Sequence, residues 1–329
     1  VDGQRYLCIT RPRRFGKSVM ANMVGAFFGR AVDGKCLFDR LQIAESANYE
    51  KYRNQYDVIS IDFSRMPRDC SSYQQYITRI QDGINQELMK AYPRLGLSLE
   101  GAVWDNLQLI FEEEWGKFVF VIDEWDAIFH KAFITEGDRM DFLAFLKNLL
   151  KGQPYVELAY MTGVLPIAKY SSGSELNMFQ EYNMAVSERY GTYFGFLEAE
   201  VDSLFHIYRQ TAKNPRITRE ELKRWYDGYQ TASGERLYNP RSVVCALTDN
   251  QLRNYWTSSG PYDEIFYYIK NNIEDIREEL VLMVSGERVK SAVQEYAATA
   301  TELASRSQIY SAMVVYGLLA YDAETGEVM

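Results

Sequence analysis

Strand-like and helix-like patterns of apolar and polar residues alternate along the first half of the chain. Runs rich in apolar and β-branched residues predict strands at 6–9, 56–63, 118–122 and 156–161. Apolar residues that recur at helical spacing predict amphipathic helices over 19–28, 73–88, 103–111 and 140–150. This alternation indicates a mainly parallel sheet with helices on both faces. The run at 118–122 is apolar throughout, as is typical of a central parallel strand.

The pattern changes near Phe194, and most of the remaining chain is expected to be helical. A helix is predicted over 198–208, and Thr218 with Glu221 forms a capping box that starts another. Asn239 followed by proline marks a third helix start. A last apolar helix is expected over 310–319, followed by a strand at 320–322. The chain therefore divides into two expected domains, 1–196 and 197–329.

A candidate phosphate-binding loop, Arg11-Pro12-Arg13-Arg14-Phe15-Gly16-Lys17-Ser18, connects the first predicted strand to the first helix. A helix N-terminus presents unpaired N–H groups and a positive dipole to an anion. Lys17 would reach the β- and γ-phosphates, and the Ser18 hydroxyl would ligate Mg²⁺. The usual spacing places glycine where this chain has Arg11. By itself, the G-K-S tripeptide is therefore equally compatible with chance.

Asp123 and Glu124, which follow the central strand, favour a phosphate-binding loop over a chance G-K-S tripeptide. A magnesium–triphosphate site needs an acidic residue at such a strand end, and Asp123 would hold the ion together with Ser18. Glu124 is placed to activate a water that attacks the γ-phosphate. With both half-motifs in the expected order, chance becomes a poor explanation for Lys17. Asp126 is better interpreted as a helix cap.

The next strand is followed by Thr162, which either contacts the γ-phosphate or the attacking water, or serves as a turn residue before Gly163. The guanidinium groups of Arg13 and Arg14 either bind phosphate oxygens or pair with carboxylates at the rim. The expected catalytic residues are Lys17, Glu124 and Thr162, and the expected metal ligands are Ser18 and Asp123. The expected nucleotide-binding residues are Arg13, Arg14, Phe15, Gly16, Lys17, Ser18 and Val19.

Composition narrows the possible classes of protein. The net charge of −9 argues against a nucleic-acid footprint that covers the whole surface. The four cysteines form no C-x-x-C pair, and Cys8 and Cys245 are expected to be buried thiols in a reducing, cytoplasmic setting. The two histidines have no ligand-spaced partner, so a zinc site is not expected. Neither a membrane-spanning run nor a signal peptide is expected.

Several phrases of this sequence resemble the AAA-ATPase-like family of bacterial proteins. They are the segment from Thr10 to Ser18, Ile61-Asp62-Phe63-Ser64, the segment from Val121 to Asp126, Met161-Thr162-Gly163-Val164, the segment from Phe194 to Glu198, the segment from Trp225 to Tyr229, and the segment from Leu237 to Pro240. The resemblance covers residues 1 to about 319 and makes the arginine-rich loop a family trait. The one departure is Trp125, where the family commonly has tyrosine.

This resemblance implies a three-layer P-loop NTPase domain with a catalytic glutamate, followed by a mostly helical, winged-helix-like region. Family members commonly continue into a PD-(D/E)XK nuclease-like domain. The triplet Glu221-Leu222-Lys223 is explained by the capping box, so we expect the chain to be cut before such a domain.

Two functions are compatible with these residues. The first is Mg²⁺-dependent ATP hydrolysis that drives a switch coupled to an effector domain. The second is a nucleotide-dependent binding module for nucleic acid or protein, with little turnover. The candidate partners are ATP, a second copy of the chain, and nucleic acid, but no membrane. Basic residues of the helical half form either a nucleic-acid-binding face or an ordinary solvated surface; they are Lys213, Arg216, Arg219, Lys223, Arg224, Arg236 and Arg241.

Overall fold

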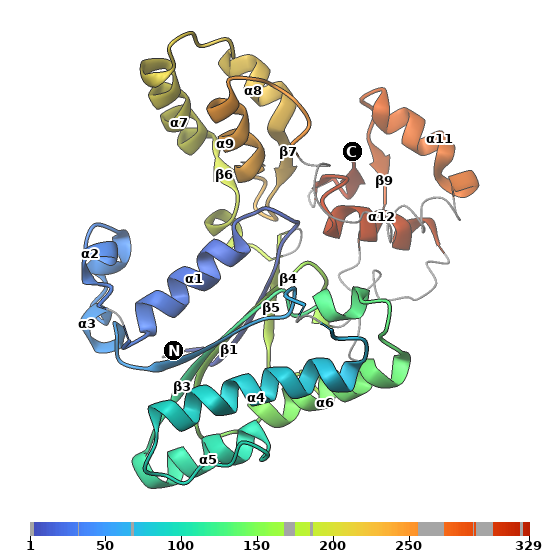
Figure 1. Cartoon of the computed structure of the whole chain (residues 1–329). Coiled ribbons are helices and arrows are strands. Elements are labelled where there is room, and N and C mark those ends of the chain that lie inside the picture. Colours follow the sequence, from blue (N-terminus) through green and yellow to red (C-terminus); the bar gives the residue numbers. More distant parts are fainter. Residues whose placement is uncertain are drawn as a thin grey trace. The chain divides into compact units, whose positions relative to one another are not determined.

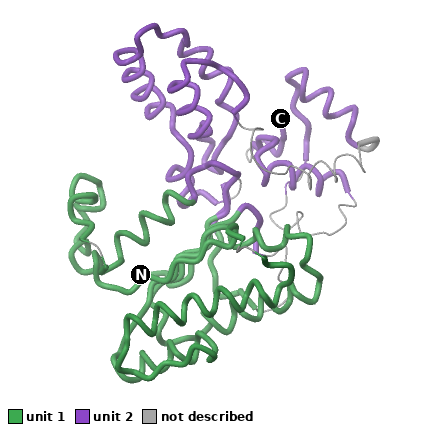
Figure 2. Tube along the Cα trace, in the orientation of Figure 1, with its two compact units in different colours: residues 1–9, 18–163, 170–181 green, residues 10–17, 164–169, 182–329 purple. Residues whose placement is uncertain are grey.

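The computed structural model describes residues 3–31, 33–66, 69–167, 175–184, 187–255, 273–291, 293, 305–322 and 325–329. The chain forms two compact units (Figure 2). The first contains residues 1–9, 18–163 and 170–181, and the second contains residues 10–17, 164–169 and 182–329. Because this division interleaves segments of the chain, it does not test the expected domains 1–196 and 197–329, which stay a prediction.

A five-stranded sheet forms the centre of the α/β fold. Its strands run in the order β2-β3-β4-β1-β5, and both β2–β3 and β3–β4 are parallel. The bounds are β1 Tyr6–Thr10, β2 Asp57–Asp62, β3 Phe118–Asp123, β4 Val156–Gly163 and β5 Gln180–Asn183. Every residue of β3 before Asp123 is buried, as its apolar run predicts. The α/β, mainly parallel fold class is confirmed, whereas β5 was missed because its sequence, QEYN, has no apolar run.

Helices cover both faces of this sheet (Figure 1). Helix α1 (Lys17–Phe28) lies on one face, and α4 (Tyr73–Ala91), α5 (Val103–Glu114) and α6 (Glu136–Leu150) lie on the other. The result is the expected three-layer arrangement. Helix α6 begins four residues before its predicted start because its first turn is polar and is closed by a capping box of Thr135 and Asp138.

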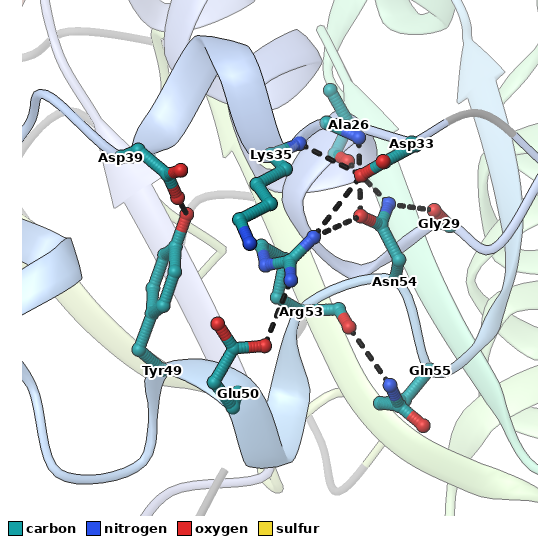
Figure 3. Close-up of polar contacts among 11 residues, drawn as sticks. Ala26, Gly29, Asp33, Lys35, Asp39, Tyr49, Glu50, Arg53, Asn54 and Gln55 are labelled. Atoms are coloured by element: carbon teal, nitrogen blue, oxygen red, sulfur yellow. Dashed lines mark hydrogen bonds and ion pairs between the residues drawn. The ribbon is translucent and has the colours of Figure 1, made fainter.

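The far end of α1 is secured by a polar network with two short helices, α2 (Lys35–Phe38) and α3 (Tyr49–Tyr52) (Figure 3). Arg53 donates to Asp33 and to Glu50. Asn54 has a left-handed backbone, and its side chain bonds to the backbone at both Gly29 and Gly34. Four-residue helices carry too little periodicity to be predicted from sequence, and here long-range polar contacts stabilise them.

The second unit is built from small sheets and helices. One antiparallel sheet has the order β6-β8-β7, and another has the order β10-β11-β9. The strands are β6 Phe196–Leu197, β7 Asp227–Gln230, β8 Arg236–Tyr238, β9 Val289–Lys290, β10 Tyr321–Asp322 and β11 Glu327–Val328. The helices are α7 Glu198–Thr211, α8 Arg219–Tyr226, α9 Pro240–Asp249, α11 Ile273–Val284 and α12 Arg306–Val315.

Three of the four predicted helix starts in this unit, those of α7, α8 and α9, are confirmed. The Thr218–Glu221 capping box begins α8, and this places Glu221 on a helix and not on a nuclease strand. The Asn239 side chain caps α9, with proline at its first position. The last helix begins four residues before its predicted start because Ser305 caps a polar first turn. It also ends at Val315 instead of residue 319, before a glycine with positive φ at 317.

All four cysteines are free thiols. Cys8 is fully buried, as expected, and burial raises its pKa well above the usual value, an effect that the charges of Glu181 and Asp126 reinforce. Cys245 was expected to be buried as well, but it is half-buried on α9, where it packs only at the margin of the core. In the part of the chain that the structure describes, no helix is long and apolar enough to cross a membrane.

Candidate functional site

The loop between β1 and α1 has an unusual backbone at two positions. Arg14 and Gly16 have φ angles of 70° and 87°, in the left-handed region that glycine tolerates best. A Cβ added at Gly16 would meet no atom within 4 Å, so this part of the loop borders open space. The loop leads directly into α1, whose second residue, Ser18, is exposed. Open space beside a helix N-terminus fits a phosphate group.

Lys17 lies across its own loop. Its side chain is only 4 % exposed, and Nζ donates to the carbonyl oxygens of Arg11 and Pro12 at 3.0 Å each. These bonds hold the ammonium group at the loop itself, where it contributes positive charge to any anion that the loop binds. A direct bond from Lys17 to a phosphate stays a prediction.

The side chains of Phe15, Arg14 and Arg13 have different surroundings from that of Lys17. Phe15 is buried with Leu237 and contacts the Tyr229 ring edge-on, with the ring centroids 4.6 Å apart. Its backbone can therefore contact a nucleotide, but its ring cannot. Arg14 donates to the carbonyl oxygen of Tyr255. Arg13 is half-buried, and its guanidinium makes no hydrogen bond or ion pair within the described residues.

The acidic turn after β3 is held by the neighbouring strands on both sides. The carbonyl of Asp123 accepts from the backbone N–H of Phe63 at 3.1 Å, and the N–H of Trp125 donates to the carbonyl of Thr162 at 3.0 Å. Glu124, between them, has a φ of 49°, which is rare for a residue with a Cβ. Such backbone persists only where its surroundings enforce it, and it is found preferentially at functional sites.

Thr162 orients the Asp123 carboxylate. Its hydroxyl donates to Oδ1 of Asp123, and the same carboxylate oxygen accepts from the backbone N–H of Glu124 at 3.2 Å. The Thr162 side chain is fully buried, whereas Asp123 and Glu124 are half-buried. A role as a turn residue alone does not account for the hydrogen bond from Thr162 to Asp123. Its direct contact with a phosphate or a water stays a prediction.

The residues around this turn are tightly packed. Trp125 is fully buried, and a Cβ at Gly163 would lie 2.5 Å from its Cδ1, so only glycine fits there. Asp126 occupies the N-cap position of a 3₁₀ helix, Ala127–His130, but its side chain makes no capping hydrogen bond. Asp126 is therefore the N-cap residue by position, as expected, but its buried carboxylate lies beside Gly163 and does not cap the helix.

The residues present suit a metal–nucleotide pair better than a metal alone. Within the described residues, no three His, Cys, Asp or Glu side chains gather in a way that could hold an ion. Ser18 and Asp123 would supply only two protein oxygens. Mg²⁺ commonly completes its octahedral shell with phosphate oxygens and water, so a triphosphate site usually has few protein ligands to the metal.

Comparison with known proteins identifies the family. Residues 1–172, more than half of the chain, match the AAA-ATPase-like family, described as "Predicted AAA-ATPase". The chain belongs to this family. AAA-ATPase-like proteins are P-loop proteins predicted to bind nucleotides, which agrees with the loop described above.

A curated relative and a solved structure are also similar to this AAA-ATPase-like chain. The relative is an uncharacterized protein in the vnfD 5′ region of Azotobacter chroococcum mcd 1, 26 % identical over 266 residues. The match covers 79 % of this chain and 48 % of the relative, so the chain spans about half the relative's length. The structure is the Aeropyrum pernix ORC2 protein (ADPNP-ADP complexes), with a TM-score of 0.44 and 11 % identity; the match covers 99 % of this chain and 82 % of that one.

The surroundings of Arg11 could not be predicted from the sequence. Its side chain is 1 % exposed, and it donates to the carbonyl oxygens of Thr10, Tyr182 and Tyr190. Thr10 is adjacent to Arg11, but Tyr182 and Tyr190 lie 171 and 179 residues farther along the chain. Nothing in the sequence around Arg11 indicates these two distant acceptors.

Proposed function

We propose that this protein binds ATP with Mg²⁺ and hydrolyses it, and that it acts as an ATP-driven switch for an effector domain. The observation that carries this proposal is the acidic turn, in which Thr162 orients Asp123 beside a strained Glu124. The strand order supports it further. Only β4 separates β1, which leads into the phosphate loop, from β3, which ends in the turn. Two strand spacings correspond to roughly 10 Å between neighbouring ends of β1 and β3 in the sheet.

Each residue has a distinct role in this proposal. The loop amides and Lys17 bind the phosphates, and Ser18 and Asp123 hold Mg²⁺, which neutralises phosphate charge when bound. Glu124 accepts a proton from the attacking water at its carboxylate. Thr162 keeps Asp123 in position through its hydrogen bond. The switch role is supported by the placement of the loop, because residues 10–17 belong to one compact unit and their chain neighbours to the other.

Isothermal titration of the purified chain with ATP tests the proposal. We expect saturable binding that requires Mg²⁺ and weakens when EDTA is added. Absence of heat and of competition against a fluorescent ATP analogue, at millimolar nucleotide, would rule out the proposal.

Replacing Thr162 with valine should raise the Mg²⁺ concentration that ATP binding requires. Valine keeps the shape but removes the hydroxyl bond to the carboxylate, and such bonds to charged groups contribute roughly 1.5–3 kcal/mol. We expect about a tenfold higher Mg²⁺ requirement, measured by titrating Mg²⁺ at fixed ATP. Thr162→Ser, which retains the hydroxyl, is the matched control and should behave like the wild type. Equal Mg²⁺ titrations for all three proteins would show that Thr162 does not position Asp123.

We expect the Arg13 side chain to bind the nucleotide, since within the described residues its guanidinium makes no hydrogen bond or ion pair. Arg13→Ala should weaken ATP binding by roughly 1.5–3 kcal/mol, which corresponds to about 10- to 100-fold, because a charge-assisted hydrogen bond is lost. The readout is the dissociation constant for ATP. Arg40→Ala, at an exposed position of the first unit, serves as the control. Unchanged affinity in Arg13→Ala would mean that this guanidinium faces away from the phosphates.

A further inference from the structure

We propose that Arg11 is a positioning residue that shapes the phosphate loop from its buried side and links nucleotide occupancy to residues 182–184 and 187–194. The inference rests on the proposed function, since it presumes that the loop binds a nucleotide. It gives a physical reason for the arginine that stands where phosphate loops usually have their first glycine.

The Arg11 guanidinium joins the loop to two other segments of the second unit. It donates to the carbonyl oxygens of Tyr182 at 2.7 Å and Tyr190 at 3.0 Å, and it lies 5.0 Å from the centre of the Phe194 ring. A third bond, at 2.7 Å, returns to the carbonyl of Thr10 and fixes the side chain to its own strand end. Several donors in one rigid plane can hold carbonyls from separate segments, which a lysine ammonium on a flexible stem does less well.

The loop backbone does not need glycine at position 11. Left-handed φ angles occur at Arg14 and Gly16, and Arg11 is not among the described residues with positive φ. The tight turn is therefore made farther along the loop, and position 11 can carry a side chain. Burial of a cation is costly unless polar partners surround it, and the three carbonyls supply those partners here.

The other end of the loop is held by the same unit. Phe15 packs on Tyr229, and a Cβ added at Gly195 would lie only 3.2 Å from Cε1 of Phe15. Between the two ends, the Asn239 side chain donates to the carbonyl of Arg13 at 3.3 Å. A change in loop shape on nucleotide binding must therefore alter these contacts.

Three of the sequence phrases that resemble the family converge on this loop. Phe194 contacts Arg11, Tyr229 contacts Phe15, and Asn239 bonds to the backbone of Arg13. None of the three phrases has a chemical role in the hydrolysis proposed above. Their shared contact with one loop is an independent indication that the second unit sets the loop's shape.

The decisive variant is Arg11→Gly, which creates the usual glycine-first motif. If position 11 were only a degenerate glycine position, this variant would bind ATP at least as tightly as the wild type. We expect at least a tenfold loss of affinity, because the carbonyls of Tyr182 and Tyr190 lose their donor and the loop loses its anchor. Hydrogen exchange gives a second readout: ATP should slow amide exchange in residues 182–184 and 187–194 of the wild type, and not in the variant.

Arg94→Gly, in an exposed turn of the first unit, is the matched control and should bind ATP like the wild type. Circular dichroism establishes that each variant is folded. If Arg11→Gly does not fold, Arg11→Lys tests the inference, because lysine keeps the charge but lacks the planar guanidinium. Arg11→Lys should bind ATP more weakly than the wild type and lose the exchange response. Wild-type affinity and exchange in either folded variant would overturn the inference alone, whereas a wild-type protein that does not bind ATP overturns the proposed function and this inference with it.

Discussion

Lys17→Ala should reduce the affinity for ATP by about 100-fold, the largest binding effect expected of any single side chain here. The wild-type ammonium is held at the loop by two carbonyl oxygens and is almost fully buried. In the proposed site, loss of this charge would remove a charge-assisted bond to the phosphates, and it would also remove the Lys17 donor to the carbonyls of Arg11 and Pro12. The measurement is isothermal titration with Mg²⁺ and ATP.

Lys90→Ala is the control for this substitution. Lys90 is exposed near the end of α4 and forms a surface ion pair with Glu87, so its removal should leave ATP affinity unchanged. Lys17→Met, which keeps the length of the side chain, separates loss of charge from loss of packing. If Lys17→Ala and Lys17→Met both bind ATP like the wild type, the loop between β1 and α1 does not bind phosphate through Lys17.

Glu124→Gln should lower the rate of phosphate release by about 10²- to 10⁴-fold and leave ATP affinity unchanged. Glutamine preserves the size of the side chain but cannot accept the proton of the attacking water. The strained backbone at Glu124 is held by the bonds of Asp123 and Trp125 to neighbouring strands, and the substitution does not alter those bonds. Steady-state phosphate release, measured beside ATP affinity, separates loss of catalysis from loss of binding.

Glu113→Gln, at an exposed position of α5, is the matched control and should release phosphate at the wild-type rate. Equal rates for Glu124→Gln and the wild type would remove Glu124 from the reaction. If the wild type binds ATP tightly and releases no phosphate even with nucleic acid or protein partners added, the nucleotide-dependent binding module becomes the better account.

The parts of the fold that could be predicted are those with strong local patterns. The apolar run of β3 and the periodic helices α4 and α5 were found from sequence because burial of one face dictates them directly. The starts of α6 and α12 were placed four residues too late, because polar capping turns carry no apolar signal. Strand β5 is polar, and only its place at the edge of the sheet makes it a strand.

The candidate site shows the same division. Asp123, Glu124 and Thr162 could be proposed from sequence because residues that follow neighbouring parallel strands gather at one edge of the sheet. The structure adds the hydrogen bond between Thr162 and Asp123. The burial of Arg11 could not be foreseen, since its acceptors at Tyr182 and Tyr190 are more than half the chain away.

Phosphate release from Mg²⁺-ATP by the wild type, Lys17→Ala and Glu124→Gln, measured side by side, tests the central claim most directly. The account predicts release by the wild type, with a loss in Lys17→Ala that higher ATP partly restores and a loss in Glu124→Gln that no ATP concentration restores. Equal phosphate release by all three proteins would contradict it.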